Sequence, residues 1–170
     1  LFRILSKNNG VLNILDTLDN DRFVYVRSMI IEGILSTDMT KHFKLCSELK
    51  TAEFKIADKS ARKLLVSLIV HLCDLSNLLY EYDHYYKWCL RITQEFDDQY
   101  KAEEKLDATK YGEPTVFLKY TNIEGFYKSQ IGFLNIIIIP MMTSFHEVLK
   151  FDKVVIDNMN KNKETLESKL

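Results

Sequence analysis

The chain has 170 residues, of which 46% are hydrophobic, and its formal net charge is -1. This length suits one domain, or a large piece of one, with a substantial buried core. The hydrophobic content excludes a disordered chain, and the near-neutral charge gives no electrostatic reason to expect nucleic acid as a partner. Only two prolines and five glycines interrupt the chain, which favours long helices over a β architecture with many turns.

The chain begins with a leucine in an amphipathic pattern, without a signal peptide, so we expect a piece of a longer protein. Its cysteines, Cys46, Cys73 and Cys89, form no CxxC pair, and we expect reduced thiols that pack in a core. This usage is typical of cytosolic proteins. The expected location is the cytoplasm or the cytosolic face of a membrane, where segments outside this chain would anchor the parent protein.

Helical periodicity runs through the first 50 residues. Asn20 or Asp21 can cap a first helix, and Thr37 or Asp38 can cap a second. The residues expected to point inward from these two helices are Phe23, Val26, Ile30, Ile34, Phe43 and Leu49.

A polar passage at 50–60 is typical of a connection, and Asp58 or Ser60 then starts a third helix. Its apolar residues with helical spacing are Ala61, Leu64, Leu65, Leu68, Ile69 and Leu72. The apolar run continues to an acid, Asp74. Because a buried ionised carboxylate normally needs a partner or a metal, Asp74 either caps the following turn or holds a ligand.

Asp83 can cap a fourth helix, and the charged stretch 97–114 runs from it into a loop at Gly112 and Pro114. The residues expected to point inward from this helix are Tyr86, Cys89, Ile92 (or Trp88) and Phe96.

A long apolar helix is expected at about 123–139. Asn135 and Pro140 interrupt it before it reaches the roughly 18 to 20 apolar residues of a membrane-spanning helix, so we expect a buried core helix that breaks at Pro140. A further helix continues to about residue 158, and 159–170 is expected as a polar tail that frays or extends into solvent. The pattern predicts an all-α fold, with one domain over 1–170 and its core at about 1–158.

Four short motifs occur in order: ILSTDMTKHF at 34–43, VHLCDLSN at 70–77, YYKWCLRITQEF at 85–96 and KSQIGFLNIIIIPMM at 128–142. In this order and at these separations they resemble the C-terminal half of the catalytic domain of class I 3′,5′-cyclic nucleotide phosphodiesterases. The family pattern there is TDM-x-KH, DxSN, a W…EF helix, and SQ-x-x-F before an apolar helix with a proline. The resemblance covers about 1–145 and implies the helical, HD-type fold. The spelling at 78–89 is most similar to protozoan, apicomplexan members.

For Asp74 the resemblance implies a ligand of a tightly held zinc ion. The complete domain would hold two divalent metals, zinc and magnesium or manganese, which supply the hydroxide that attacks the cyclic phosphate. The other family ligands come from HNxxHA and HDxxH motifs, and neither motif occurs in this sequence. The general acid is likewise expected upstream. The alternative for Asp74 is a cap on the turn toward Ser76 and Asn77.

Gln130 is implied to hydrogen-bond the purine, because its amide offers both a donor and an acceptor. Phe133, three residues later on the same helix face, would stack on the base, and Ile92 would press from the opposite side. The alternatives are a surface position for Gln130 and ordinary core packing for Phe133 and Ile92.

Four further residues match pocket positions of the family. Asn77 would contact the base, or cap the next turn, and Thr37 would bond a metal-bound water, or cap a helix. Met39 and Leu75 would line the pocket, or simply pack. His71 resembles a family position without a metal role, so we do not assign it as a ligand.

Three departures from the family pattern bear on substrate choice. Tyr100 stands where the family has glycine, and Leu78 replaces a proline. The segment GEPTVFLK at 112–119 keeps Pro114 but lacks an acid–arginine pair, so its pocket contacts cannot be carried over. The preference between cAMP and cGMP therefore stays open.

Two hypotheses follow. The first is part of a metal-dependent phosphodiesterase that hydrolyses cAMP or cGMP to the 5′-monophosphate, with the cyclic nucleotide and the N-terminal half of the domain as partners. On this hypothesis the chain alone is inactive and exposes apolar surface that makes it self-associate. The alternative is a non-catalytic helical module of the same fold that senses nucleotides or binds proteins. The oligomeric state of the parent protein stays open.

Overall fold

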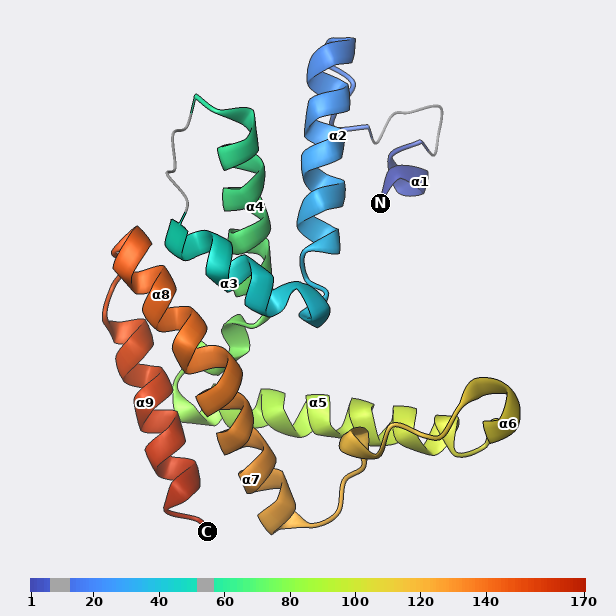
Figure 1. Cartoon of the computed structure of the whole chain (residues 1–170), viewed down its shortest axis with the longest axis vertical. Coiled ribbons are helices and arrows are strands. Elements are labelled where there is room, and N and C mark those ends of the chain that lie inside the picture. The colour runs from blue at the N-terminus through green and yellow to red at the C-terminus, as the bar shows by residue number, and fades with distance from the viewer. Residues whose placement is uncertain (7–12, 52–56) are drawn as a thin grey trace. The chain divides into compact units, whose positions relative to one another are not determined.

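The computed structural model describes residues 1–6, 13–51 and 57–170, and these contain helices and no strand. The predicted all-α fold is confirmed. The described residues form two compact units, Leu1–Cys73 and Asp74–Leu170 (Figure 1). The prediction of a single domain therefore stays a prediction, and the predicted connection at 50–60 lies partly outside the described residues.

The helices of the first unit begin close to the predicted positions. They are α1 (Phe2–Leu5), α2 (Asn20–Leu35), η2 (Met39–Lys41), α3 (His42–Thr51) and α4 (Lys59–Asp74). The α2 cap is Asp19 rather than Asn20 or Asp21, because Asp19 Oδ1 accepts the Arg22 N–H at 2.8 Å. Asp58 caps α4 as predicted.

Helices α2 and α4 approach each other closely at Gly33 and Ser36. Gly33 is buried on α2, and a Cβ atom there would lie 3.3 Å from Val70 Cγ2 on α4. Any larger side chain would push the helices apart unless Val70 moved. Beside this contact, the buried Ser36 hydroxyl donates to the Ser67 carbonyl of α4 at 3.0 Å. The two helices are thus joined by both apolar packing and a long-range hydrogen bond.

The inner face of α3 differs from the prediction by one position. Leu49 is buried as predicted, together with His42 and Leu45, but Phe43 is 63% exposed. His42, Leu45 and Leu49 repeat at three and four residues, so the buried stripe lies beside Phe43 rather than over it.

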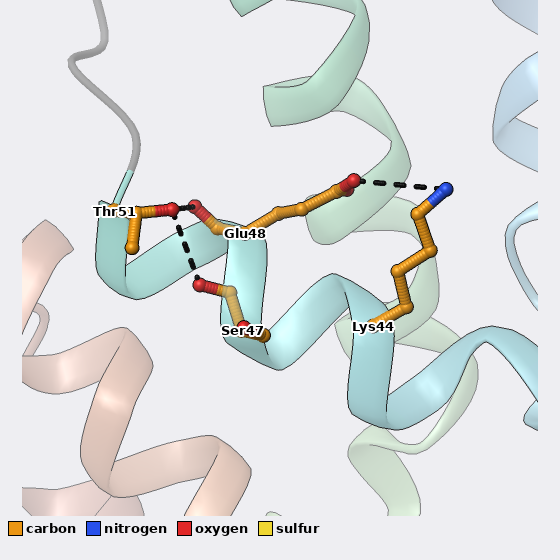
Figure 2. A network of polar contacts seen from close by, with 4 residues as sticks. All are labelled: Lys44, Ser47, Glu48 and Thr51. Atoms are coloured by element: carbon orange, nitrogen blue, oxygen red, sulfur yellow. Dashed lines mark hydrogen bonds and ion pairs between the residues drawn. The ribbon is translucent and has the colours of Figure 1, made fainter.

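The outer face of α3 carries polar contacts between residues of the same helix (Figure 2). Lys44 Nζ lies 3.8 Å from Glu48 Oε1, and the Thr51 hydroxyl donates to the Ser47 and Glu48 carbonyls. An exposed pair of this kind contributes about 0 to 1 kcal/mol. The free energy of packing α3 therefore comes from its buried stripe.

The second unit contains a longer series of helices. They are η3 (Ser76–Leu79), α5 (Tyr82–Glu103), α6 (Ala108–Tyr111), η4 (Val116–Leu118), α7 (Ile123–Phe133), the π-helical η5 (Leu134–Ile138), α8 (Ile139–Leu149) and α9 (Val154–Glu167). Asp83 does not cap α5, which begins after Glu81, and lies in its first turn. Gly112 ends α6 with φ 87°, a conformation that favours glycine.

Pro140 does not break the apolar helix, contrary to the prediction. Helix α7 passes through the π-helical turn η5 and into α8 without interruption, as Figure 1 shows. A proline inside an α-helix clashes with the carbonyl four residues earlier, and the wider π-helical turn before Pro140 makes room for its ring. The helix ends instead at Lys150, which has the left-handed φ of 52°.

The continuous helix from Ile123 to Leu149 is 27 residues long, with a mean hydropathy of 1.5, and by length and composition alone could cross a membrane. Buried core helices of soluble proteins pass the same test. Here one face is packed: Leu134, Ile138, Met141, Met142 and Phe145 are each at most 1% exposed. The predicted burial is therefore confirmed for this face of the helix.

Helix α9 packs against α7 and α8 and runs antiparallel to them (Figure 1). The segment 159–170, predicted as a frayed or solvated polar tail, continues this helix to Glu167 and buries part of it. Met159, Asn162 and Leu166 are each at most 1% exposed. Their spacing of three and four residues places them on one buried face of the helix. Because polar residues separate them, the sequence alone indicates a solvated tail.

The inner face of α5 agrees with the prediction in part. Cys89 is buried as predicted, and Tyr86 and Ile92 are half-buried, but Trp88 is 43% and Phe96 39% exposed. The other buried residues of this helix are Tyr85, Asp97 and Tyr100. Burial raises the pKa of the Cys89 thiol to about 12, so it packs as a protonated thiol, as predicted. Cys73, predicted in the core, is exposed.

Leu166 tests whether 159–170 is a packed helix. The change Leu166→Ala removes a fully buried side chain, and we expect it to lower the free energy of unfolding by about 2–5 kcal/mol. Leu170→Ala, at a position 58% exposed, is the matched control and should change stability by less than about 0.5 kcal/mol. Urea unfolding of the 170-residue chain measures both, and equal effects would contradict the packed helix.

Candidate functional site

Asp74 ends α4 with an exposed side chain. In the described part of the chain, its carboxylate makes no hydrogen bond or ion pair, and the turn that follows begins at Leu75 without a side-chain cap. The capping alternative is therefore not what the structure contains. The carboxylate can bind a ligand without first giving up a partner inside the protein.

Leu75 and Asn77 follow Asp74 on the turn η3, and both are half-buried. This turn packs against α5, which carries the half-buried Ile92, and against α9. The backbone therefore brings the DxSN motif and the helix of Ile92 together. Asn77 caps no helix in the structure, because the helix that follows begins after Glu81.

Gln130 and Phe133 lie three residues apart on α7, and both are half-buried. Asn122 starts this helix, since its side-chain oxygen accepts the Gly125 N–H at 2.7 Å. The Gln130 side-chain amide forms no hydrogen bond within the residues that the structure describes. It keeps both its donor and its acceptor for a ligand.

Thr37 and Met39 belong to the first unit, whereas the other predicted site residues belong to the second. The Thr37 hydroxyl donates to the Ile34 carbonyl at 2.9 Å, which closes the end of α2. Met39 is 39% exposed at the start of η2, where Asp38 caps the turn by accepting the Thr40 N–H. The Thr37 hydroxyl oxygen keeps its lone pairs for a further donor.

The described residues do not form a metal site by themselves. No group of three or more His, Cys, Asp or Glu side chains over 1–6, 13–51 and 57–170 is arranged to hold a metal ion. A carboxylate oxygen has the right chemistry for zinc, magnesium or manganese, but a zinc site needs three or four protein ligands. Asp74 fits as one ligand of a set and not as a site.

A buried histidine pair, which the sequence did not reveal, precedes Asp74. His42 Nδ1 of α3 lies 3.0 Å from His71 Nε2 of α4, and Cys46 Sγ lies 3.7 Å from His42 Nε2. One of the two facing ring nitrogens must donate to the other. This pair joins α3 to α4 through the Nε2 atom of His71.

At Tyr100 and at 112–119, where the sequence departs from the family pattern, the structure contains a continued helix and a loop that is hydrogen-bonded to it. Tyr100 is helical and 7% exposed, so α5 simply continues to Glu103 where the family pattern predicts a glycine turn. The loop that follows is tied back to α5, since Glu103 Oε2 accepts the Thr115 N–H at 2.8 Å. Hydrogen bonds from Gln99 and Thr115 lower the pKa of Glu103.

Asp97 makes the second tie between this loop and α5. Its Oδ1 atom accepts the Tyr120 N–H at 3.0 Å, and its Oδ2 atom pairs with Lys101. The Lys101 ammonium and the Tyr120 N–H lower the pKa of Asp97 below its usual value. Tyr120 lies just before α7, so this hydrogen bond holds the loop against α5 close to the start of the helix that carries Gln130.

Two open pockets along the described residues are lined by residues other than the predicted site residues. One, of about 420 Å³, lies between the apolar faces of α2 and α4. The other, of about 410 Å³, is polar and lies between α9 and the start of α5. The residues that line this second cavity include Asn158 and Asn162, which sequence reasoning missed because asparagines in a polar helix carry no periodic signal.

Comparison with known proteins gives a consistent family. A family model described as 3′5′-cyclic nucleotide phosphodiesterase matches residues 1–159. The chain is 32% identical over 165 residues, 95% of its length, to a dual specificity calcium/calmodulin-dependent 3′,5′-cyclic nucleotide phosphodiesterase 1 of Drosophila melanogaster. It is 30% identical over 160 residues, 86% of its length, to a dual 3′,5′-cyclic-AMP and -GMP phosphodiesterase beta of Plasmodium falciparum.

Among solved structures, the phosphodiesterase domain of the Salpingoeca rosetta rhodopsin phosphodiesterase shares the fold over 98% of this chain, with a TM-score of 0.86 at 24% identity. The chain spans 51% of that solved chain, and 19% and 13% of the lengths of the Drosophila and Plasmodium relatives. The Plasmodium relative is no more similar than the Drosophila one, so the placement among protozoan members stays a prediction.

Asp97 predicts a specific dependence of stability on pH. Its pKa is lowered on folding from the usual 3.8, so the stability it contributes is present above that pH and is lost as the pH falls through the lower folded value. Asp97→Asn keeps an acceptor for Tyr120 but loses the charge. We expect its thermal midpoint to fall below that of the unchanged chain near neutral pH, with the gap closing in acid.

The measurement is thermal unfolding of the chain and of Asp97→Asn across that pH range. Asp16→Asn, at an exposed aspartate outside the helices, is the control and should lower the thermal midpoint far less at every pH. If Asp97→Asn lowers the thermal midpoint by the same amount at all pH values, the charge of Asp97 does not stabilise its contacts with Lys101 and Tyr120.

Proposed function

The chain belongs to the 3′,5′-cyclic nucleotide phosphodiesterase family, and we propose on that basis that it supplies the C-terminal half of a catalytic domain that hydrolyses cAMP or cGMP to the 5′-monophosphate. The observation that carries this proposal is Asp74: an exposed carboxylate, unpaired among the described residues, directly after an apolar helix and inside the DxSN motif. A carboxylate kept free of protein partners at such a position is available as a metal ligand.

Asp74 would provide one ligand of a zinc ion, with magnesium or manganese as the second metal of the domain. The remaining ligands and the general acid would come from the N-terminal half of the domain, which is the chain's proposed partner. When bound, the metals supply the activated water and stabilise negative charge on the phosphoryl group. In the cell, the proposed setting is signalling in the cytoplasm or at the cytosolic face of a membrane.

The residues of this chain would mainly bind and orient the substrate. The Gln130 amide would hydrogen-bond the purine, since it can offer a donor and an acceptor to either adenine or guanine. Phe133 and Ile92 would hold the two faces of the base, a contact that stacking makes favourable. Holding the base fixes where the cyclic phosphate lies, and orientation of this kind is a large part of catalysis.

Four residues would complete the pocket. Asn77 would contact the base, and Thr37 would hydrogen-bond a water beside the phosphate. Leu75 and Met39 would line the walls near the ribose and exclude water from the reacting bond. The choice between cAMP and cGMP depends on which way the Gln130 amide points, and the side chains around it set that orientation.

Asp74 gives the first test. In a polypeptide extended at its N-terminus to the length of the solved relatives and supplied with Mn²⁺, Asp74→Ala should lower the rate of cAMP and cGMP hydrolysis by at least about 100-fold, because a metal ligand is lost. Asp83→Ala, an exposed aspartate of the same unit, is the matched control and should retain activity. The 170-residue chain alone should show no turnover.

Turnover by the 170-residue chain alone would contradict the proposal that most metal ligands come from the N-terminal half of the domain. A folded, metal-loaded extended protein that has no activity would instead favour the non-catalytic module, which binds nucleotide or protein without hydrolysis.

Gln130 gives the second test. Gln130→Ala should raise KM for the cyclic nucleotide about tenfold, because one or two hydrogen bonds to the base are lost, each worth about 0.5–1.5 kcal/mol. Gln94→Ala, an exposed glutamine on α5, is the control. Steady-state kinetics with cAMP and with cGMP measures both, and an unchanged KM for both substrates would remove Gln130 from the base site.

A further inference from the structure

The connection between Asp74 and α5 is a tight turn with backbone groups that need partners. It consists of η3 (Ser76–Leu79) followed by Tyr80, whose backbone is extended with φ -73° and ψ 164°. The last carbonyls of a helical turn have no partner within the turn itself. The carbonyls of Leu78 and Leu79 are in this position, and the Tyr80 carbonyl follows them directly. A buried carbonyl without a partner, such as that of Leu78, would destabilise the connection.

Two asparagines of α9 donate to these three carbonyls. Asn162 Nδ2 lies 2.8 Å from the Tyr80 oxygen and 3.3 Å from the Leu78 oxygen. Asn158 Nδ2 lies 3.2 Å from the Leu79 oxygen. The two asparagines are four residues apart, on one face of α9, and so act together on successive carbonyls of the turn.

The Asn162 side chain is only 1% exposed, so it contributes little to the polar surface of α9 and serves as a hydrogen-bond donor to the turn. A buried side-chain amide is unfavourable unless it is hydrogen-bonded, and both hydrogens of its NH₂ group are used by the turn. An aspartate in its place could donate neither bond, and an aliphatic side chain would leave both carbonyls without these donors.

Helix α9 also contacts the other elements of the second unit that carry predicted site residues. It packs on α5, the helix of Ile92, and on α7, the helix of Gln130 and Phe133, as well as on η3. Helix α9 therefore contacts each of the three elements that carry the predicted base-site residues of the second unit. Asn162 lies beyond residue 159, where the match to the family model ends.

We propose that Asn158 and Asn162 are positioning residues for the metal and base sites. By fixing the carbonyls of 78–80, they hold the turn that runs from Asp74 into α5 within the second unit, and so the placement of Asp74 and Asn77 on it. They touch neither substrate nor metal and act through the turn. This inference rests on the proposed function, and on the hydrogen bonds above for its geometry.

The test separates positioning from folding. In the extended polypeptide, Asn162→Leu should raise the Mn²⁺ concentration that gives half-maximal hydrolysis about tenfold, because a turn without these donors would misplace Asp74. Misplacing a metal ligand weakens metal binding on the scale seen when its outer partners are lost. Saturating Mn²⁺ should restore most of the rate. Simple destabilisation would instead lower the amount of active protein and leave the half-maximal concentration unchanged, which would overturn the proposal.

Two further variants keep the test decisive. Asn160→Leu changes an exposed asparagine of the same helix and should leave the Mn²⁺ dependence unchanged. If Asn162→Leu does not fold, Asn158→Leu, which removes one bond from a half-buried position, should show a smaller shift in the same direction. An unshifted Asn158→Leu, or an Asn160→Leu that shifts equally, would overturn the proposal.

Hydrogen exchange distinguishes failure of this inference from failure of the proposed function. In the 170-residue chain, Asn162→Leu should speed amide exchange over 75–81 while α8 keeps its protection. No turnover from the unsubstituted extended protein counts against the proposed function alone, and faster local exchange would still support the role of Asn162 in holding the turn. Unchanged exchange over 75–81 would overturn that role.

Discussion

The second unit depends on the burial of one apolar stripe along the continuous α7–η5–α8 helix. Leu134, Ile138, Met141, Met142 and Phe145 are excluded from solvent by their neighbours, among which α9 runs alongside. Each such side chain contributes about 1.5–3 kcal/mol when fully buried, far more than an exposed ion pair. The stripe is continuous only because the π-helical turn lets the helix pass Pro140. With a break there, α8 would lose its register with α7.

The position of α9 has consequences for the polar groups that it meets. An apolar stripe fixes a helix laterally but tolerates small shifts along its axis, whereas hydrogen bonds to identified carbonyls do not. Met159 and Leu166 supply the apolar contact, and Asn162 supplies the directional one, between them in sequence. The helix that completes the core is thus also the helix that defines the backbone after Asp74. Packing and site geometry are coupled through one element.

The sequence predicted the helices well and their buried faces less well. Periodicity locates a helix, but when apolar residues surround it, as in α3 and α5, it does not say which stripe is covered. The periodicity therefore predicts that Phe43 and Phe96 point inward, with Trp88 as the alternative to Ile92, and all three named aromatic residues are exposed in the structure. Caps shifted by one or two residues where several acceptors stand in a row, as at Asp19 and its neighbours. A π-helical turn has no composition signal, so the sequence predicts a break at Pro140 that the structure does not contain.

The site was predictable only in part, for a similar reason. Asp74 and Gln130 stand in motifs whose spelling is local, and the motifs identified them. The partners of Asn162 are 82 and 84 residues earlier in the chain, and nothing in its own surroundings distinguishes it from the exposed Asn160. Long-range hydrogen bonds of this kind are specified by the fold, so a linear pattern in one sequence does not reveal them.

The polar side chains of Asp74 and Asn162 are stabilised in opposite ways, one by water and the other by hydrogen bonds inside the protein. The Asn162 amide is buried, and both of its donor hydrogens are bonded, so its geometry is fixed before any ligand arrives. The Asp74 carboxylate is exposed and, among the described residues, unpaired, so water stabilises its charge and the isolated chain loses nothing by keeping it. A metal would have to displace that water, and one carboxylate alone does not compensate for the metal's own lost hydration. Tight binding therefore requires additional ligands, and the backbone held by α9 would then decide whether Asp74 meets them.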